Sequence, residues 1–302
     1  MGIISSLINA SPGAIAQGLI WGIMALGVFI TFKILDVADL TVDGTLSLGG
    51  GVCVMLIRGG MPVPTAILIA TLSGLLAGFM TGFFYTKCKI PVILAGILTQ
   101  LSLYSINLRV MQGKANQPVS VDKYDLLVSQ RFVYELNMKN PIFILIIVVI
   151  IIVALLYIFF GTEFGNAIRA TGDNKNMSRA QGINTDKMII IGLMLSNAMV
   201  ALSGALLAEY QGANDVNMGR GAIVIGLAAC IIGEALIGKH FKNFSIKLFA
   251  VVIGAIIYYL VLQLVLNFGL NTNDLKLFTA LFVAFFLSMP VFINNFKLGG
   301  KS

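Results

Sequence analysis

Long apolar segments alternate with short polar ones along the whole chain. They lie at about 14–35, 45–57, 65–84, 91–111, 141–160, 188–209, 222–237, 248–269 and 277–294. Within each segment the apolar residues are continuous, whereas the strands of a membrane barrel alternate apolar and polar residues. Backbone polar groups in lipid must be satisfied within their own segment, which favours helices. The pattern predicts about nine membrane helices, of which the second and the seventh are short.

The composition excludes a soluble domain. Apolar residues make up 58% of the 302 residues and charged residues only 11%, and the mean hydropathy is +0.95. Soluble domains carry about 25% charged residues, so this chain has too few charged groups to keep its surface in water. Although the length alone would suggest two domains, the continuous apolar segments predict one all-α membrane domain over 1–302, with a polar loop at 161–187 within it.

The net charge of +7 agrees better with a membrane protein than with a nucleic-acid-binding one. Cytoplasmic loops of membrane proteins carry an excess of Lys and Arg. Placing the 161–187 loop in the cytoplasm puts more than half of the basic residues on that side. This orientation predicts an N-terminus outside the cell and a C-terminus inside it.

Metal, disulfide and nucleotide chemistry find no support in the sequence. The cysteines Cys53, Cys88 and Cys230 have unrelated spacings, and His240 is the single histidine, so neither a disulfide framework nor a metal site is expected. The stretch 233–239 reads G-x-x-x-x-G-K but lacks the final Ser or Thr and ends a membrane helix, so we reject a phosphate-binding loop.

The first helix is expected to remain in the protein. Residues 1–13 contain no basic residue ahead of the first apolar segment, whereas a cleaved signal peptide has a positively charged start.

Glycines recur every four residues on two predicted helices. Gly74, Gly78 and Gly82 lie on one face, and Gly18 and Gly22 on another. Such faces let helix backbones approach closely, so the spacing predicts tight packing within a bundle.

Two short stretches resemble each other, TLSGLLAG at 71–78 and ALSGALLA at 201–208. The predicted topology runs them in opposite directions across the membrane. This is the arrangement of an inverted repeat, which places the path of a transporter at the interface between repeats. Eight residues of low complexity also fit a coincidence, and both interpretations stay open.

Three carboxylates, Asp36, Asp39 and Asp43, stand between the first two apolar segments, and glycines follow at 49–51. One interpretation is that Asp39, Thr41 or Asp43 caps the next helix, whose free N–H groups need acceptors. The other is a broken helix beside a polar pathway, because irregular backbone at membrane depth occurs only where it is buried in protein or lines a cavity. The two interpretations are compatible.

Further polar residues lie inside the predicted spans. Glu234 is an ionisable group in a short apolar helix, which by default suggests a functional site, and an interfacial ion pair with Lys239 is the alternative. The other members of this group are amides that either bridge helices or line a pathway: Gln100, Asn107, Asn197 and Gln263.

The polar stretch 161–184 predicts a short helix that lies flat on the basic side. Gly172 and Asp173 indicate its start and Gly182 its end. The helix would present Asn174, Met177, Ser178 and Gln181 outward. A surface of this kind suits docking of another protein, and a plain interfacial loop is the alternative.

At these residues the sequence resembles the permease subunits of ATP-binding-cassette importers, in the branched-chain amino acid and ribose permease group. The resemblance rests on RATGDN at 169–174, on Ala180 and Gly182-Ile183, and on SGALL at 203–207. The string ADLTV at 38–42 is similar to an Asp-Leu-Ser-Val element of the sugar permeases. The resemblance to the permease group covers about 14–295. Ile232-Gly233-Glu234 departs from the relatives, which are apolar or glycine-rich at these positions. This departure resembles a subgroup linked to uptake of amino acids, including aromatic ones.

The resemblance implies a fold similar to that of the vitamin B12 importer permease, and it makes the 161–187 loop the coupling loop that inserts into a cleft of the ATPase. The coupling residues would then be Arg169, Thr171, Asp173, Asn174, Met177, Ser178, Arg179, Gln181 and Gly182. The polar residues within the spans become candidates for the translocation path: Asp39, Thr41, Asp43, Gln100, Asn107, Asn197 and Glu234.

The family further implies two ATPase subunits, an extracytoplasmic binding protein that is often a lipoprotein, and a second permease, most simply as a homodimer, in a bacterial plasma membrane. No cofactor is expected in this chain, because ATP and Mg²⁺ belong to the partner ATPase. The chain is accordingly predicted not to be an enzyme.

The resulting hypothesis is a permease subunit that forms the path for a small solute, an amino acid of branched-chain or aromatic type being favoured and a sugar or nucleoside being the alternative. A rival is a secondary transporter or channel driven by an ion gradient, in which Asp39, Asp43 and Glu234 would carry protons or sodium. An intramembrane enzyme is disfavoured, because one histidine and no paired catalytic groups leave little for hydrolysis.

Overall fold

The computed structural model describes residues 3–135, 137, 139–238 and 243–267, together with 277, 279–281, 283–285 and 288. Its elements are α1 (Ile3–Phe29), which continues as the π-helix η1 (Ile30–Ile34), α2 (Val42–Arg58), α3 (Val63–Thr86), α4 (Val92–Val110), β1 (Asn116–Pro118), the 3₁₀ turn η2 (Gln130–Phe132), α5 (Pro141–Gly161), α6 (Glu163–Asp173), α7 (Lys175–Ala180), α8 (Thr185–Gln211), β2 (Ala213–Asp215), α9 (Ala222–Gly233), the π-helix η3 (Glu234–Gly238) and α10 (Phe244–Asn267).

The described part of the chain is a polytopic helical bundle, as the sequence predicts. Six of its helices are long and apolar enough to cross a membrane: α1 with η1, α3, α4, α5, α8 and α10. The second and seventh predicted segments are indeed shorter, as α2 and as α9 with η3. Of the ninth segment only a few residues within 277–288 are described, and they are helical. The count of nine and the likeness to the vitamin B12 permease therefore stay predictions.

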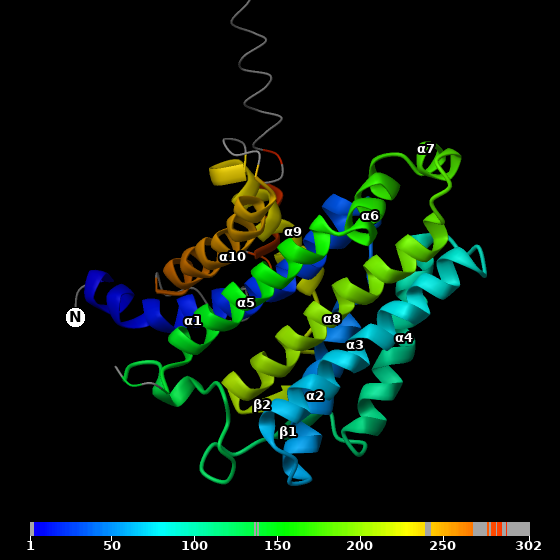
Figure 1. The fold of residues 1–302 in the computed structure, drawn as a ribbon. Helices are drawn as coiled ribbons and strands as arrows, with labels where there is room; N and C mark the ends of the chain where they lie inside the picture. Colours follow the sequence, from blue (N-terminus) through cyan, green and yellow to red (C-terminus); the bar gives the residue numbers. More distant parts are fainter. Residues whose placement is uncertain are drawn as a thin grey trace, which may run out of the picture.

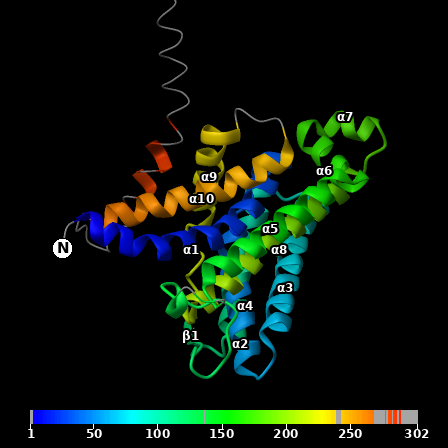
Figure 2. The ribbon, with the colours of Figure 1, turned by 60° about the vertical axis from the view of Figure 1, so that its left-hand side comes forward.

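The helices divide into two neighbouring groups (Figures 1 and 2). Helices α1 and α10 lie side by side, and α3 packs against α8 near α2 and α4. Helices α6 and α7 stand out at one end of the bundle, and the small antiparallel sheet of β1 and β2 lies at the opposite end. We call these the α7 end and the sheet end.

The glycine faces bring helices together as predicted. A Cβ added at Gly74 would lie 2.3 Å from the carbonyl oxygen of Asn197, and one at Gly78 would lie 2.3 Å from that of Leu193. Gly18 faces the backbone of Ile256 in α10 in the same manner. No side chain fits at these positions, so the close approach of α3 to α8 and of α1 to α10 requires glycine.

The two similar stretches touch at Gly74 and Ala201, in the interface between α3 and α8. Farther along, Gly78 meets Leu193 and Gly82 meets Ile190, so the two helices run antiparallel. Opposite directions are what an inverted repeat requires. The repeat itself stays a prediction.

Helices α2 and α9 both begin inside the bundle. After β2 the chain runs back along α2, where the Asn214 side chain donates to the Ser47 carbonyl over 3.3 Å and the backbone N of Gly219 donates to the Ser47 hydroxyl over 3.1 Å. The backbone N of Gly221 then reaches Asp43 at the start of α2. Since Gly221 has φ +86°, a glycine suits the turn into α9.

The polar stretch 161–184 forms two helices where one was predicted. The expected short helix is α7, and α6 is an additional helix that the Thr162 side chain caps by accepting from Gly165 N over 3.3 Å. Ser178 is 2% exposed, so the prediction that it points outward is wrong. The reason is that the following turn folds back: Ile183 N donates to the Ser178 carbonyl over 3.0 Å.

Candidate functional site

A buried polar group occupies the break between η1 and α2, and we call it the Asp39 cluster: Asp39, Thr41, Thr45, Thr81 and Asn197. Asn197 Nδ2 donates to Asp39 Oδ2 over 2.7 Å, and Thr41 N donates to Asp39 Oδ1 over 2.9 Å. Thr45 Oγ1 donates to Asn197 Oδ1 over 2.7 Å, while the hydroxyls of Thr41 and Thr81 lie 2.7 Å apart.

The Asp39 cluster fixes the position of the break. It ties the segment between η1 and α2 to α3 through Thr81 and to α8 through Asn197. Asp39 is 1% exposed, and within the described residues it has no ion-pair partner. Each of its oxygens accepts a hydrogen bond, one from an amide and one from a backbone N–H, which is how a buried polar group avoids a large desolvation cost. The cluster therefore positions the backbone of the break.

A second group lines a cavity of about 400 Å³ beside α4, which we call the α4 pocket: Asp43, Gly44, Gln100, Leu101, Tyr104, Asn107, Val216 and Arg220. Asp43 Oδ2 accepts from Gly221 N over 3.0 Å, and Asp43 Oδ1 accepts from Ile223 N over 3.1 Å. The prediction that a residue of this segment caps α2 is therefore wrong, because Asp43 caps α9 instead. Thr41, at the start of α2, makes no side-chain cap.

Asn107 is the most deeply buried polar side chain of the α4 pocket. Its Nδ2 donates to the Gly44 carbonyl over 3.2 Å, and its Oδ1 has no hydrogen-bond partner in the described structure. With only 1% of the residue exposed, this oxygen is poorly placed for bulk water. A buried acceptor without a hydrogen bond costs free energy, so a donor that reached this oxygen would stabilise the protein.

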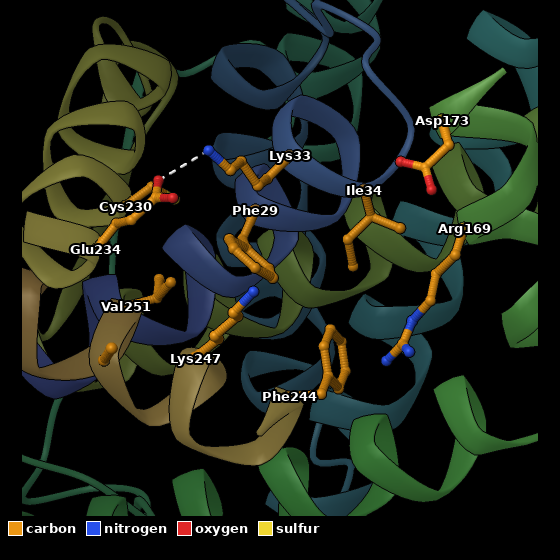
Figure 3. A pocket seen from close by; sticks show the side chains of 11 residues that line it. Phe29, Lys33, Ile34, Arg169, Asp173, Cys230, Glu234, Phe244, Lys247 and Val251 are labelled. Atoms are coloured by element: carbon orange, nitrogen blue, oxygen red, sulfur yellow. Dashed lines mark hydrogen bonds and ion pairs between the residues drawn. The ribbon is translucent and has the colours of Figure 1, made fainter. Parts of the chain in front are cut away.

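A third group lies at the α7 end around a cavity of about 300 Å³, which we call the α6 pocket and which Figure 3 shows. Glu234 of η3 forms an ion pair with Lys33 of η1 over 2.8 Å. The ion pair predicted for Glu234 named Lys239, which lies outside the described residues, so that pairing stays a prediction. The remaining lining residues are Phe29, Ile34, Arg169, Asp173, Cys230, Phe244, Lys247, Ala250 and Val251.

Arg169 anchors α6 to the bundle. Its guanidinium carbon lies 3.9 Å from the ring centroid of Phe244 and 5.5 Å from that of Phe160, in cation–π contact. Burial lowers the pKa of this guanidinium from its ordinary value. Gly172 reinforces the contact, since a Cβ there would lie 1.8 Å from the Ile34 carbonyl oxygen.

The predicted coupling residues separate into a buried and an exposed set. Thr171 is buried and donates to the Ala167 carbonyl over 2.7 Å, and Ser178 is buried as well. Arg169 is half-buried against its two rings. Exposed are Asp173, Asn174, Met177, Arg179, Gln181 and Gly182.

Helix α7 is held in a defined orientation. Asn174 Oδ1 accepts from the backbone N of Asn176 and of Met177 over 3.1 and 3.0 Å. Arg179 Nε donates to Thr185 Oγ1 over 2.8 Å, and its Nη2 lies 3.3 Å from Asp186. Met177, 61% exposed, is thereby presented on the outer surface of α7.

The structure distributes the candidate path residues over three places. Asp39, Thr41 and Asn197 meet in the Asp39 cluster, Asp43, Gln100 and Asn107 meet at the α4 pocket, and Glu234 stands apart at the α6 pocket. Sequence reasoning missed Thr45, Thr81, Tyr104 and Arg220. Thr45 could have been found, since it follows Thr41 by one helical turn, whereas nothing local marks Arg220.

Most of the chain matches a known family of membrane permeases. The family described as the permease component of branched-chain amino acid transport systems matches residues 13–289. The tyrosine transport system permease protein of Clostridioides difficile (strain R20291) is 40% identical over 272 residues, which is 90% of this chain and 88% of that protein.

Two more distant relatives extend the comparison. An uncharacterized protein of Rickettsia prowazekii is 33% identical over 87% of this chain and 91% of its own length. The autoinducer 2 import system permease protein of Photorhabdus luminescens is 30% identical over 86% of this chain and 74% of its own length. With six helices able to cross a membrane and a family match over nearly its whole length, the chain is a multi-pass membrane protein that belongs to the family of branched-chain amino acid transport system permease components.

Proposed function

We propose that this chain forms the translocation path of an ATP-driven importer and that its solute is an amino acid. The family supports the role of a permease. The single observation that carries the coupling to an ATPase is α7, a short helix with an exposed apolar residue that stands out from the bundle in a fixed orientation (Figures 1 and 2).

Docking at α7 would transmit force because α6 and α7 are firmly connected to the spans. Arg169 stacks on Phe244 of α10, and Gly172 rests on the backbone of η1. Arg179 joins α7 to the start of α8. A displacement of α7 by an ATPase would therefore reach η1, α8 and α10 directly.

The assembly follows from this role. The α7 end faces the cytoplasm, where two ATPase subunits supply ATP and Mg²⁺, and the sheet end faces an extracytoplasmic binding protein. A second copy of the chain completes the permease. This orientation puts the α6 pocket on the cytoplasmic side and the N-terminus outside the cell.

An amino acid is the solute best supported by the relatives. The tyrosine transport permease is 40% identical to this chain, whereas the permease of the autoinducer 2 import system is 30% identical. Both relatives are matched over most of their length, so the higher identity favours an amino acid over a sugar-like solute.

Purification from native membranes and uptake measurements test this function together. A nucleotide-binding subunit should co-purify with the permease in stoichiometric amount, and ATP should drive amino acid uptake in reconstituted vesicles. Met177→Asp should lower uptake at least tenfold, because a charge on the docking surface must be desolvated at the contact. Met177→Leu keeps the apolar contact and should transport normally.

The outcomes separate the candidate functions. Normal uptake by both Met177→Asp and Arg179→Ala would remove the docking role of α7. Uptake that collapses with an ionophore while ATP is maintained would instead favour a transporter driven by an ion gradient.

A further inference from the structure

The α4 pocket presents one carboxylate and one guanidinium that do not pair with each other. Asp43 and Arg220 both line the cavity, yet within the described residues neither forms an ion pair, so their charged atoms are more than 4.0 Å apart. Arg220 is exposed and its side chain makes no hydrogen bond in the described structure. The pocket thus offers two separated, opposite charges.

The carboxylate of Asp43 is held in place but not saturated. Each of its oxygens accepts one backbone N–H at the start of α9, from Gly221 and from Ile223. A carboxylate has about four acceptor positions, so Asp43 can accept a further donor that enters the cavity.

Asn107 supplies an independent indication of a ligand. Its Oδ1 is buried and has no partner among the described residues, and the residue lines the same cavity. Such a group is satisfied by water or by a ligand donor. An ammonium, with three N–H donors, would serve Asn107 Oδ1 and Asp43 together.

The remaining lining matches an amino acid with an apolar or aromatic side chain. Gln100, Tyr104 and Asn107 follow one face of α4 at helical spacing. Leu101 and Val216 add apolar surface beside the Tyr104 ring. A cavity of about 400 Å³ lies within the range of small-molecule sites.

We propose that the α4 pocket is a solute subsite for a zwitterionic α-amino acid. Asp43 and Asn107 accept hydrogen bonds from the α-ammonium, Arg220 binds the α-carboxylate through its planar pair of N–H donors, and Tyr104 contacts the side chain. The inference deepens the proposed function and rests on it, since it assigns the contacts of the same solute within the permease.

A binding assay on the full chain in lipid nanodiscs tests the subsite without the selectivity of a binding protein. The probe is radiolabelled L-tyrosine, competed with tyramine, which lacks the carboxylate, and with 3-(4-hydroxyphenyl)propionate, which lacks the ammonium. Arg220→Gln should lower the affinity for L-tyrosine at least tenfold and the affinity for tyramine less than twofold. Asp43→Asn should lower the affinity for L-tyrosine by a similar factor and the affinity for 3-(4-hydroxyphenyl)propionate less than twofold.

Opposite selectivity in the two variants distinguishes recognition from misfolding, because a folding defect would lower the affinity for all three compounds together. Arg109→Gln is the control, because Arg109 is an exposed arginine of α4 that does not line the cavity, and the binding of this variant should equal that of the unmodified chain. Arg220→Gln removes a side chain without partners, so it tests the subsite even if Asp43→Asn fails to fold.

The ammonium and anion of a phosphatidylethanolamine headgroup share this chemistry. The nanodiscs are therefore made without this lipid and then with it. If the lipid occupies the pocket and L-tyrosine does not bind, or if Arg220→Gln binds all three compounds like the unmodified chain, the proposal is overturned. ATP-driven amino acid uptake into closed vesicles that contain the permease with its ATPase and binding protein would show that the proposed function survives such a result, and its absence would show that the function has failed as well.

Discussion

Asn197 of α8 donates a hydrogen bond to the buried carboxylate of Asp39 over 2.7 Å, across 158 positions of sequence. The bond joins the middle of a membrane span to the irregular segment between η1 and α2. Because irregular backbone within a bundle survives only where its polar groups are satisfied, this contact allows α2 to begin inside the protein. The α4 pocket depends on the same geometry, since Asp43 opens α2 four residues after Asp39.

Removing the amide of Asn197 should destabilise the bundle. In Asn197→Leu the buried Asp39 loses the amide that donates to its Oδ2 and keeps only its contacts with Thr41, at a cost of about 1–3 kcal/mol. Thermal unfolding in detergent measures the change. Asn176→Leu, at an exposed position of α7, should leave the unfolding temperature nearly unchanged, and equal losses in the two variants would contradict the assignment.

Adding one methyl group at Gly78 should disrupt the contact between α3 and α8. The new Cβ would lie 2.3 Å from the Leu193 carbonyl oxygen, so backbone must move, at a cost of about 1–3 kcal/mol. Gly161→Ala is the matched control, because nothing lies within 4 Å of a Cβ at that position. Size-exclusion profiles after stepwise heating compare the two, with earlier aggregation expected for Gly78→Ala alone.

The cap that Asp43 makes on α9 should slow hydrogen exchange of the backbone N–H groups at the start of that helix. In Asp43→Ala the backbone N–H groups of Gly221 and Ile223 lose their acceptor, which weakens the helix start by about 1 kcal/mol. Hydrogen exchange should become faster at 221–225, while α5, which lies elsewhere, keeps its rate. Unchanged exchange at 221–225 would mean that the cap contributes nothing.

The ion pair of Lys33 and Glu234 should contribute little to stability. Their side chains are 49% and 53% exposed, and exposed pairs stabilise proteins by about 0–1 kcal/mol. A double-mutant cycle of Lys33→Ala and Glu234→Ala measures the coupling. If uptake falls in each single variant and returns in the charge-swapped pair Lys33→Glu with Glu234→Lys, the pair acts in transport despite its small energy.

Several features follow from local sequence patterns. Continuous hydrophobicity predicted the helices because each span satisfies its own backbone, and the Gly74, Gly78 and Gly82 spacing predicted a close contact because only glycine removes the Cβ. The short helix α7 was predicted as well, but it begins at Lys175 after the cap Asn174 and not at Gly172 and Asp173, which end α6.

Other features depended on partners far away in the chain. Asp43 was expected to cap its own helix, but its two oxygens accept from the backbone N–H groups of Gly221 and Ile223 at the start of α9. Lys239, predicted as a partner of Glu234, lies outside the described residues, and η1 brings Lys33 to Glu234 from the other end of the sequence. Ser178 was expected to point outward, and the turn at Ile183 buries it.

Contiguous residues are enough to predict a helical membrane permease, because hydrophobic length, glycine spacing and family motifs are local properties of a chain. Which polar side chains meet depends instead on how the helices pack. Asp39 with Asn197, and Asp43 with Asn107 and Arg220, are brought together by helices that pack across the bundle. The spacing of such residues along the chain carries no information about that packing, because hydrogen bonds and cavities depend on distances in space.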